Sequence, residues 1–364
     1  MTQEELLSIV GNFAIEGKAE EVCPLGNGLI NTTYKVITAD NGPVYVLQHV
    51  NTDIFPDPDM LMGNIVAVTD HIRAKLAANG VTDIKRRCLK FVPTLDGKYY
   101  TTHQGQCWRI MEYITDCVSR TGVSPESAYI VGSTFGEFQA MLADIPASLG
   151  ETIKDFHNME FRLQQLREAV ATDAVGRLAE VKWLVDELEA RADEMCKGER
   201  LYREGKLPKR ICHCDTKVDN ILFDKEGNVL CVIDLDTVMP GSLLYDFGDG
   251  VRFAACNSAE DERDLSKVYH RLDLFEQYTH GFLDGIGANI TENERDMLPV
   301  SVVILTYELV LRFLGDYLNG DIYFRVAEDR PKHNLERGRA QLKLTLDTIS
   351  KLDEMKKIVD KYSK

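Results

Sequence analysis

Basic residues are scarce in this sequence. The 364 residues include 42 Lys and Arg against 58 Asp and Glu, which gives a formal net charge of −16. Nucleic acids and anionic membrane surfaces are bound by clusters of Lys and Arg, so this acidic balance argues against both classes of partner. It does not argue against a phosphorylated small molecule, because a few local groups and a metal ion are enough to hold one.

The sequence also lacks the signs of a secreted protein. Its nine cysteines are an odd number and lie between Cys23 and Cys256 without a repeated spacing, so they do not predict a disulfide framework. The first residues, MTQEELLSIVGNF, contain no basic region followed by a long apolar run, so we expect no secretory signal. Both features favour a cytoplasmic protein.

One apolar run, MLPVSVVILTYELVLRFL, occupies residues 297–314. It contains Glu308 and Arg312, which are four residues apart and therefore lie on one face of a helix. Charged side chains are costly inside a lipid bilayer. The run therefore predicts a buried helix with a functional polar pair, and we expect no membrane partner.

The pattern of turns and apolar residues predicts an α+β fold. Residues 1–112 read mainly as strands with Gly-rich turns, interrupted by helices near the N-terminus and at 59–79. Residues 113–364 read mainly as helices, except for three short strands within 209–236. We therefore expect a small β-rich N-terminal lobe and a larger helical C-terminal lobe that contains a small β island. Helical periodicity in the second lobe covers 126–144, 160–204, 259–284, 292–318 and 333–360.

The stretch RICHCDTKVDNILF, residues 210–223, concentrates the chemistry of the chain. Structural zinc sites need two pairs of Cys or His ligands, and no second pair follows Cys212 and Cys214 at a useful distance. A nucleophilic cysteine needs a base and a positive environment, whereas several acids surround these thiols. Instead of a zinc site or a catalytic thiol, the sequence therefore favours Cys212 and Cys214 as buried cysteines of a strand.

The same stretch contains the pattern H-x-D-x-K-x-x-N, formed by His213, Asp215, Lys217 and Asn220. Protein kinases have a catalytic loop with this spacing, in which the Asp accepts the proton of the acceptor hydroxyl and the Asn holds magnesium. We expect Asp215 to be the catalytic base and Lys217 to neutralise charge on the transferred phosphoryl group. His213 is better placed to orient the loop than to act as a base.

Further segments complete this interpretation. The apolar strand VLCVIDLD presents Asp234 as a second magnesium ligand, and Asp236 follows as a metal partner or substrate ligand. Gln48 occupies the strand position where kinases have a lysine, and the next helix, PDMLMGNIVAVTDHIRAKLAANG, has no glutamate to pair with one. Gln48 can still donate hydrogen bonds to a phosphate. Asp246 is expected to brace the catalytic loop.

These residues resemble the aminoglycoside phosphotransferase and choline kinase family, which has a protein-kinase-like, two-lobed fold. Within that family the resemblance is strongest to the N-acetylhexosamine 1-kinases. It covers nearly the whole chain, through GLINTTYKV, YVLQHVNTDIFPD, HCDTKVDNILFD, VIDLDTVMPGSLLYDFGDGVRF, EDERDLSKV and LRFLGDYLNGDIYF. It implies phosphorylation of the anomeric hydroxyl of GlcNAc or GalNAc, with ATP as co-substrate and Mg²⁺ as cofactor.

The resemblance also implies roles for individual residues. Asn220 and Asp234 would hold magnesium, and Asp215, Asp236, Arg312 and Tyr323 would contact the sugar. The residues expected to bind the nucleotide are Gly26, Asn27, Gly28, Thr32, Gln48, Glu112, Tyr113 and Ile114. The last three belong to the hinge segment MEYI. One departure from the family is Leu29, where a His often follows the second Gly, and it leaves the sugar preference open.

Two alternatives remain at the level of the sequence. The acceptor could be an aminoglycoside, choline, homoserine or another small hydroxyl compound. Binding of an aminoglycoside would require acidic residues that line the cleft, and binding of choline would require an aromatic cage. A nucleotide-binding pseudokinase is suggested by the missing strand lysine, but the complete set of Asp215, Asn220 and Asp234 argues against it. We expect a monomer or weak oligomer with small-molecule partners.

Overall fold

The computed structural model describes residues 1–26 and 30–363, which form two compact units. Unit 1 contains Met1–Ser119, Asp144–Lys154 and Ile221–Met239, and unit 2 contains Arg120–Ala143, Asp155–Asn220 and Pro240–Lys364. The expected lobes, 1–112 and 113–364, are contiguous in sequence, whereas both units are assembled from separate segments. The assignment of nucleotide binding to the first lobe and sugar binding to the second stays a prediction.

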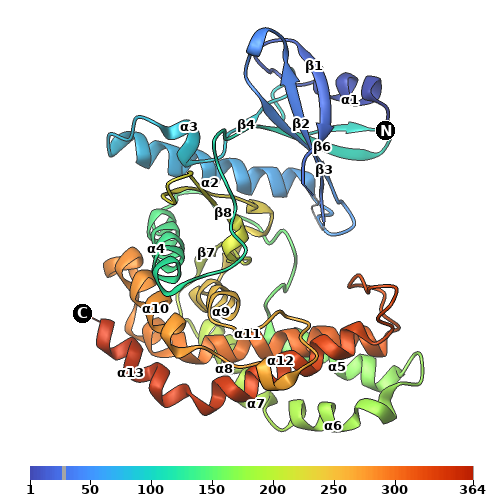
Figure 1. Cartoon of the computed structure of the whole chain (residues 1–364), viewed down its shortest axis with the longest axis vertical. Coiled ribbons are helices and arrows are strands. Elements are labelled where there is room, and N and C mark those ends of the chain that lie inside the picture. The colour runs from blue at the N-terminus through green and yellow to red at the C-terminus, as the bar shows by residue number, and fades with distance from the viewer. Residues whose placement is uncertain (27–29, 364) are drawn as a thin grey trace. The chain divides into compact units, whose positions relative to one another are not determined.

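Unit 1 is built on an antiparallel sheet in the order β1-β2-β3-β6-β4, with β5 paired to β6 (Figure 1). Helix α1 (Gln3–Val10) begins at a capping box formed by Thr2 and Glu5 and packs against the sheet. The apolar residues Ile9, Leu47 and Trp108 are buried between them. The strands are β1 (Ala19–Pro24), β2 (Thr32–Thr38), β3 (Tyr45–Val50), β4 (Phe91–Val92), β5 (Thr101–His103) and β6 (Gln106–Glu112).

Two later segments join unit 1 through α2 (Pro58–Ala78), which begins with Asp57 as its N-cap and Pro58 in its first turn. The buried Asn64 on this helix donates hydrogen bonds to the carbonyls of Gly150 (2.7 Å) and Val238 (3.0 Å). These bonds satisfy backbone groups of both segments. The other elements of unit 1 are η1 (Ala39–Asn41), α3 (Ile84–Arg87), β8 (Ile221–Phe223), β9 (Val229–Val232) and η3 (Leu235–Thr237).

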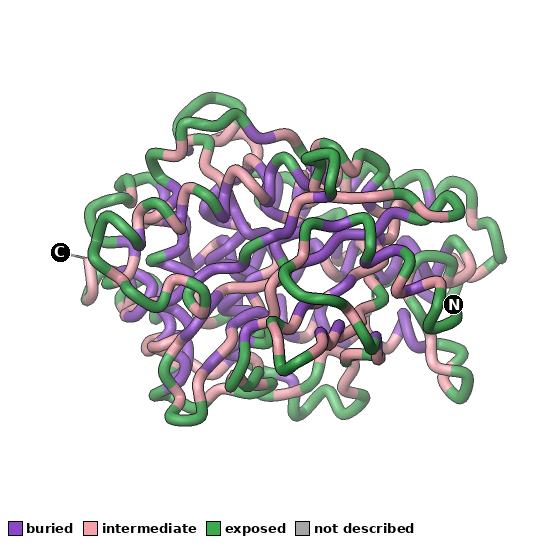
Figure 2. Tube along the Cα trace, turned by 90° about the horizontal axis from the view of Figure 1, so that it is seen from above, coloured by how far each residue is buried: buried purple, intermediate pink, exposed green. Residues whose placement is uncertain are grey.

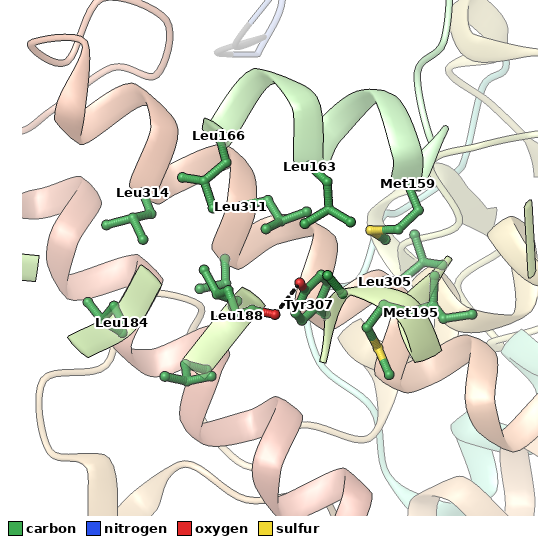
Figure 3. Close-up of a cluster of buried hydrophobic side chains, with 14 of the residues drawn as sticks. Met159, Leu163, Leu166, Leu184, Leu188, Met195, Leu305, Tyr307, Leu311 and Leu314 are labelled. Carbon is green, nitrogen blue, oxygen red and sulfur yellow. Dashed lines mark hydrogen bonds between the residues drawn. The ribbon is translucent and has the colours of Figure 1, made fainter. Parts of the chain in front are cut away.

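Unit 2 is mainly helical, and α11 (Glu292–Leu318) passes through its core. Figure 3 shows Leu and Met side chains packed around this helix, with the Tyr307 hydroxyl donating a hydrogen bond to the Leu188 carbonyl (2.8 Å). The remaining helices are α4 (Pro125–Leu142), α5 (Met159–Thr172), α6 (Leu178–Glu189), α7 (Ala192–Met195), α8 (Lys197–Arg203), α9 (Leu243–Ala254), α10 (Leu272–Ile286), α12 (His333–Ser350) and α13 (Leu352–Tyr362). Short elements are β7 (Arg210–Cys212), β10 (Met239–Gly241), η2 (Val218–Asn220), η4 (Leu265–Lys267) and η5 (Gly287–Asn289).

Four glycines allow α4 and α10 to cross at very short distance. Gly132 and Gly136 on α4 face Gly281 and Gly285 on α10, and a Cβ atom at any of them would overlap the backbone of the other helix. The four-residue spacing places each pair on one helical face. This crossing fixes α4, which carries a side chain that supports the candidate site.

Helix α11 is long and apolar enough to span a membrane by length and composition, and 83% of its most apolar window is buried within the protein. In Figure 2 the buried residues, coloured purple, gather in the interior, and the exposed residues, coloured green, lie mostly in the outer loops. A capping box of Thr291 and Glu294 starts the helix. The prediction of a buried helix at 297–314 is confirmed.

The α+β class is confirmed, with three differences in detail. The region 160–204 forms four helices, and the first break follows Asp173, whose left-handed conformation (φ 40°) ends α5. The helix expected over 259–284 begins only at Leu272. The β island is divided, since β7 pairs with β10 while the β8–β9 hairpin packs with unit 1.

Candidate active site

The loop after β7 is held by a buried carboxylate on α9. Asp246 accepts hydrogen bonds from the backbone N–H groups of His213 (2.9 Å) and Cys214 (2.8 Å) and from the side-chain amide of Gln139 on α4 (2.6 Å). The side chain of Asp246 is fully buried. Three donors compensate for the removal of this carboxylate from water. As predicted, Asp246 braces the loop that leads to Asp215, while the catalytic role of this loop stays a prediction.

The chain bends just before Asp215. Cys214 has a φ of 62°, a conformation that non-glycine residues rarely adopt. The ring of His213 lies edge-on to Phe135 and Phe138, and its Nδ1 atom accepts the backbone N–H of Asp215 (3.3 Å). The expected role of His213 in orienting the loop is therefore confirmed by its contacts.

Asp215 sits among groups that stabilise its ionised form. Its Oδ2 atom accepts hydrogen bonds from Lys217 Nζ (2.8 Å) and Asn220 Nδ2 (3.0 Å), and 27% of its side chain is exposed. Burial opposes ionisation, but Lys217, His213 and Asn220 together lower the pKa of Asp215. The carboxylate is thus ionised at neutral pH and can accept a proton from a hydroxyl group.

Asn220 and Asp234 fit a divalent cation by their donor atoms. The Asn220 amide nitrogen is bound to the Asp215 carbonyl (2.8 Å) and carboxylate, so the amide oxygen points elsewhere and accepts no hydrogen bond from the described residues. Asn220 directly precedes β8 and belongs to unit 2, whereas the exposed Asp234 follows β9 and belongs to unit 1. Amide and carboxylate oxygens suit magnesium, which is commonly completed by nucleotide phosphates. Accordingly, the described residues form no group of three His, Cys, Asp or Glu ligands.

Asp236 is part of a buried ion pair that the sequence analysis missed. Arg109, in the middle of β6, donates to its Oδ1 atom at 2.5 Å, and both side chains are at least 95% buried. Asn31 donates to the other oxygen at 2.6 Å. Asp236 therefore has a structural role in unit 1, and its contact with a sugar stays a prediction. The available signal was a basic residue, Arg109, between the apolar residues Trp108 and Ile110 of the segment CWRIMEYI.

Gln48 belongs to the same network. Its side-chain oxygen accepts two hydrogen bonds from Arg109 (3.0 and 2.8 Å), and its amide nitrogen donates to Thr33 (3.1 Å). Arg109 thus bridges Gln48 and Asp236. The expected phosphate contact of Gln48 stays a prediction, for which one amide hydrogen remains.

The remaining residues that are predicted to bind the nucleotide belong to unit 1. Gly26 has a φ of 68°, which favours glycine, and Thr32 is exposed at the start of β2. Asn27, Gly28 and Leu29 lie outside the described residues. Glu112 ends β6, and Tyr113 donates its N–H to the Val44 carbonyl.

The hinge segment leaves one backbone donor available. Among the described residues, the N–H of Ile114 makes no hydrogen bond, although the side chain of Ile114 is buried. The neighbouring amide of Tyr113 is already paired. An unpaired backbone N–H beside an apolar side chain can bind the edge of a planar heterocycle.

Arg312 lies among aromatic rings in unit 2. Its guanidinium carbon is 5.3 Å from the ring centre of Phe156, 5.9 Å from Tyr323 and 5.4 Å from Phe324. Arg312 also pairs with Glu308 on the same helix (3.6 Å), as predicted, and only 14% of its side chain is exposed. The structure therefore brings together Arg312 and Tyr323, two of the four residues predicted to contact the sugar.

Two residues that the sequence analysis did not place complete this cluster. Arg162 on α5 lies 3.8 Å from Glu308, and His157 donates to Glu308 at 2.8 Å. Burial of Glu308 opposes its ionisation, but His157, Arg312 and Arg162 together lower its pKa. The cluster therefore contains more positive than negative charge.

Cys212 and Cys214, in the stretch 210–223, are buried thiols. All nine cysteines of the chain are free thiols. Burial raises the pKa of Cys212, and contact with Cys212 together with burial raises that of Cys214, so neither is a thiolate at neutral pH. Both cysteines are buried as predicted, but only Cys212 lies in a strand, because β7 ends there and Cys214 belongs to the following loop.

Comparison with known structures identifies the fold. An aminoglycoside phosphotransferase from Alicyclobacillus acidocaldarius is similar, with a TM-score of 0.59 and 14% identity over 97% of this chain and 96% of that chain. A spectinomycin phosphotransferase in complex with ADP and spectinomycin gives 0.56 and 12% over 97% and 99%. A choline/ethanolamine kinase family protein from Mesorhizobium loti gives 0.53 and 16% over 98% and 100%. The expected protein-kinase-like fold is confirmed.

The family follows from the sequence itself. Residues 21–277 match the family described as the phosphotransferase enzyme family. The matched region includes the candidate base Asp215 and both candidate metal ligands, Asn220 and Asp234. It spans well over half of the chain, which therefore belongs to the phosphotransferase enzyme family.

Proposed function

We propose that the protein transfers the γ-phosphoryl group of ATP to the anomeric 1-hydroxyl of an N-acetylhexosamine, GlcNAc or GalNAc. Asp215 orients the hydroxyl and accepts its proton, and Lys217 neutralises charge on the phosphoryl oxygens. Asn220 and Asp234 would hold magnesium, which would offset the negative charge of the nucleotide phosphates. Catalysis then rests mainly on positioning and electrostatic stabilisation.

The nucleotide is proposed to bind unit 1. The free N–H of Ile114 would receive the adenine edge, and the turn that contains Gly26 and Gly28 would approach the phosphates. Gln48 would contribute its remaining amide hydrogen. We also propose a cytoplasmic protein that is a monomer or weak oligomer.

The observation that best supports a sugar acceptor is the set of side chains that surround Arg312. The rings of Phe156, Tyr323 and Phe324 could form a cage for a quaternary ammonium, but they already surround a guanidinium of the chain itself. Arg162 adds a second positive charge nearby. Such a site repels choline and polycationic aminoglycosides, whereas Arg and aromatic side chains can bind sugar hydroxyls and the apolar face of a sugar ring.

A panel of acceptors tests the proposal. With ATP and magnesium, ADP release is expected with GlcNAc or GalNAc and not with choline, ethanolamine, homoserine or kanamycin. Phosphorus NMR of the product should show an anomeric phosphate. Turnover confined to a cationic acceptor would contradict the proposed substrate, and no turnover with any acceptor would favour a nucleotide-binding pseudokinase.

Arg312→Met should weaken sugar binding without affecting the nucleotide. Loss of a charge-assisted hydrogen bond costs about 1.5–3 kcal/mol, so KM for the sugar is expected to rise about 10- to 100-fold while KM for ATP stays unchanged. Steady-state kinetics with each substrate varied in turn measures both. The control is Arg325→Met, which removes the same charge from an exposed position after α11. Equal effects of the two substitutions would argue against a specific role for Arg312.

A further inference from the structure

His157 lies between the Arg312 cluster and the catalytic loop. It is buried, with Nδ1 2.8 Å from the Glu308 carboxylate and Nε2 3.1 Å from the carbonyl oxygen of Cys214. Cys214 directly precedes Asp215 and has the strained positive φ. A continuous chain of contacts therefore runs from Arg312 through Glu308 and His157 to the backbone beside the candidate base.

The partners of His157 define its protonation state. A carbonyl oxygen only accepts hydrogen bonds, and Glu308 also only accepts while it is ionised. Arg312 and Arg162 stabilise that ionised form. Both ring nitrogens must then donate, which requires the doubly protonated imidazolium. A neutral imidazole would leave one buried acceptor without a donor, at a cost comparable to a lost buried hydrogen bond.

The surroundings of His157 are consistent with a buried cation. The charged or titratable groups that face it, besides Glu308, are Asp249 and Tyr245 on α9, Cys214 in the loop, and Arg162 and Arg312 at the far side of Glu308. Burial lowers the pKa of His157, but Glu308, Asp249 and the Cys214 carbonyl outweigh it, so the pKa is raised above 6.5.

We propose that His157, held as an imidazolium by Glu308, is a positioning residue that couples the acceptor subsite at Arg312 to the catalytic loop at Asp215. This inference rests on the proposed function for the identity of the acceptor. The His157–Cys214 bond fixes the backbone next to Asp215, and the Glu308–Arg312 pair fixes the side chain that holds the acceptor. A displacement of the Arg312 side chain therefore changes the position of the backbone next to Asp215, and the reverse also holds.

The coupling predicts an alkaline limb in the pH profile. The raised pKa of His157 means that, while Glu308 is ionised, its bonds are complete below that folded-state pKa and are lost as pH rises through it. The wild-type kcat is therefore expected to fall above neutrality. In Glu308→Gln, the Gln amide can donate to Nδ1 of a neutral imidazole whose Nε2–H still donates to Cys214. This variant should lose the alkaline limb, although its KM for the acceptor should rise because Arg312 loses its partner.

The test combines kinetics with NMR on the full-length protein. His157→Gln cannot bridge both acceptors, and we expect its kcat to fall about 10²-fold, the size of effect that follows from small misplacements in an active site, with the ATP dissociation constant unchanged. In ¹⁵N NMR of wild-type protein, the signal that disappears in His157→Gln should show an imidazolium at a pH below the alkaline limb, and a neutral ring in Glu308→Gln at the same pH. His71→Gln, on α2 of unit 1, is the matched control and should keep the wild-type kcat.

The outcomes separate this inference from the proposed function. If His157 is neutral in the wild type, or if His157→Gln retains kcat within twofold, the coupling is refuted. If His157→Gln does not fold, the NMR state and the pH profile of Glu308→Gln decide. If N-acetylhexosamines are not substrates, the proposed function fails, and the same kinetics are carried out with whichever acceptor the panel identifies, while the NMR result stands independently.

Discussion

Asp215→Asn is expected to lower kcat about 10²- to 10⁴-fold, the range over which general bases contribute. The Asn amide keeps the size of the side chain and can still contact Asn220 and Lys217, but it cannot accept the proton of the acceptor hydroxyl. The lowered pKa of Asp215 means that the wild-type residue is already ionised at neutral pH. The ATP dissociation constant, measured by fluorescence titration with magnesium, should remain close to that of the wild type.

Asp219→Asn provides the matched control for this substitution. Asp219 lies in the same loop but is exposed, so the same loss of one carboxylate should leave kcat unchanged. A correctly folded Asp215→Asn protein with near-normal turnover would exclude Asp215 as the base. An equal decrease of kcat in both variants would instead indicate that the loop is sensitive to the loss of any negative charge.

Arg109→Met is expected to destabilise the protein by about 3–5 kcal/mol, the cost of leaving one partner of a buried ion pair without the other. Asp236 is 4% exposed at its side chain and would retain only Asn31 as a side-chain donor, while Gln48 would lose both hydrogen bonds from the guanidinium. Urea denaturation monitored by circular dichroism measures the change in the free energy of unfolding.

The double variant Arg109→Met/Asp236→Asn tests the cause of that loss. Removing the buried charge as well as its partner should recover part of the stability, since the unpaired carboxylate is the main penalty. Lys225→Met breaks the exposed Lys225–Asp116 pair of the same unit and should leave stability unchanged. A double variant no more stable than Arg109→Met would show that packing, and not the buried charge, determines the effect.

Local patterns predicted the main elements well where they repeat regularly. The helix expected at 59–79 is α2 (Pro58–Ala78), and the one expected at 292–318 is α11 with the same bounds. Long amphipathic or apolar runs with clear caps leave the chain few alternatives. Helix breaks within 160–204 were missed, because Asp173 adopts its left-handed conformation inside a segment whose apolar periodicity continues across the break.

The sequence also predicted the catalytic loop, because His213, Asp215, Lys217 and Asn220 are close together in the chain. Their mutual hydrogen bonds follow from one short turn. The resemblance indicated Arg312 and Tyr323, which the structure brings together. Their roles toward a sugar stay a prediction.

The groups that hold these residues in place were not predictable. Arg109 lies 127 residues before Asp236, and His157 lies 151 residues before Glu308, so no spacing in the sequence links either pair.

By itself, the sequence determined the class of fold, the family and the order of the candidate site residues along the chain. These depend on local periodicity and on short motifs. Only the tertiary structure decided which polar residues became buried together: Arg109 with Asp236 and Gln48, and His157 with Glu308. A buried charge must find a partner wherever packing places one. Which residues become partners depends on how distant segments of the chain pack together. The number of residues between them in the sequence does not encode this packing.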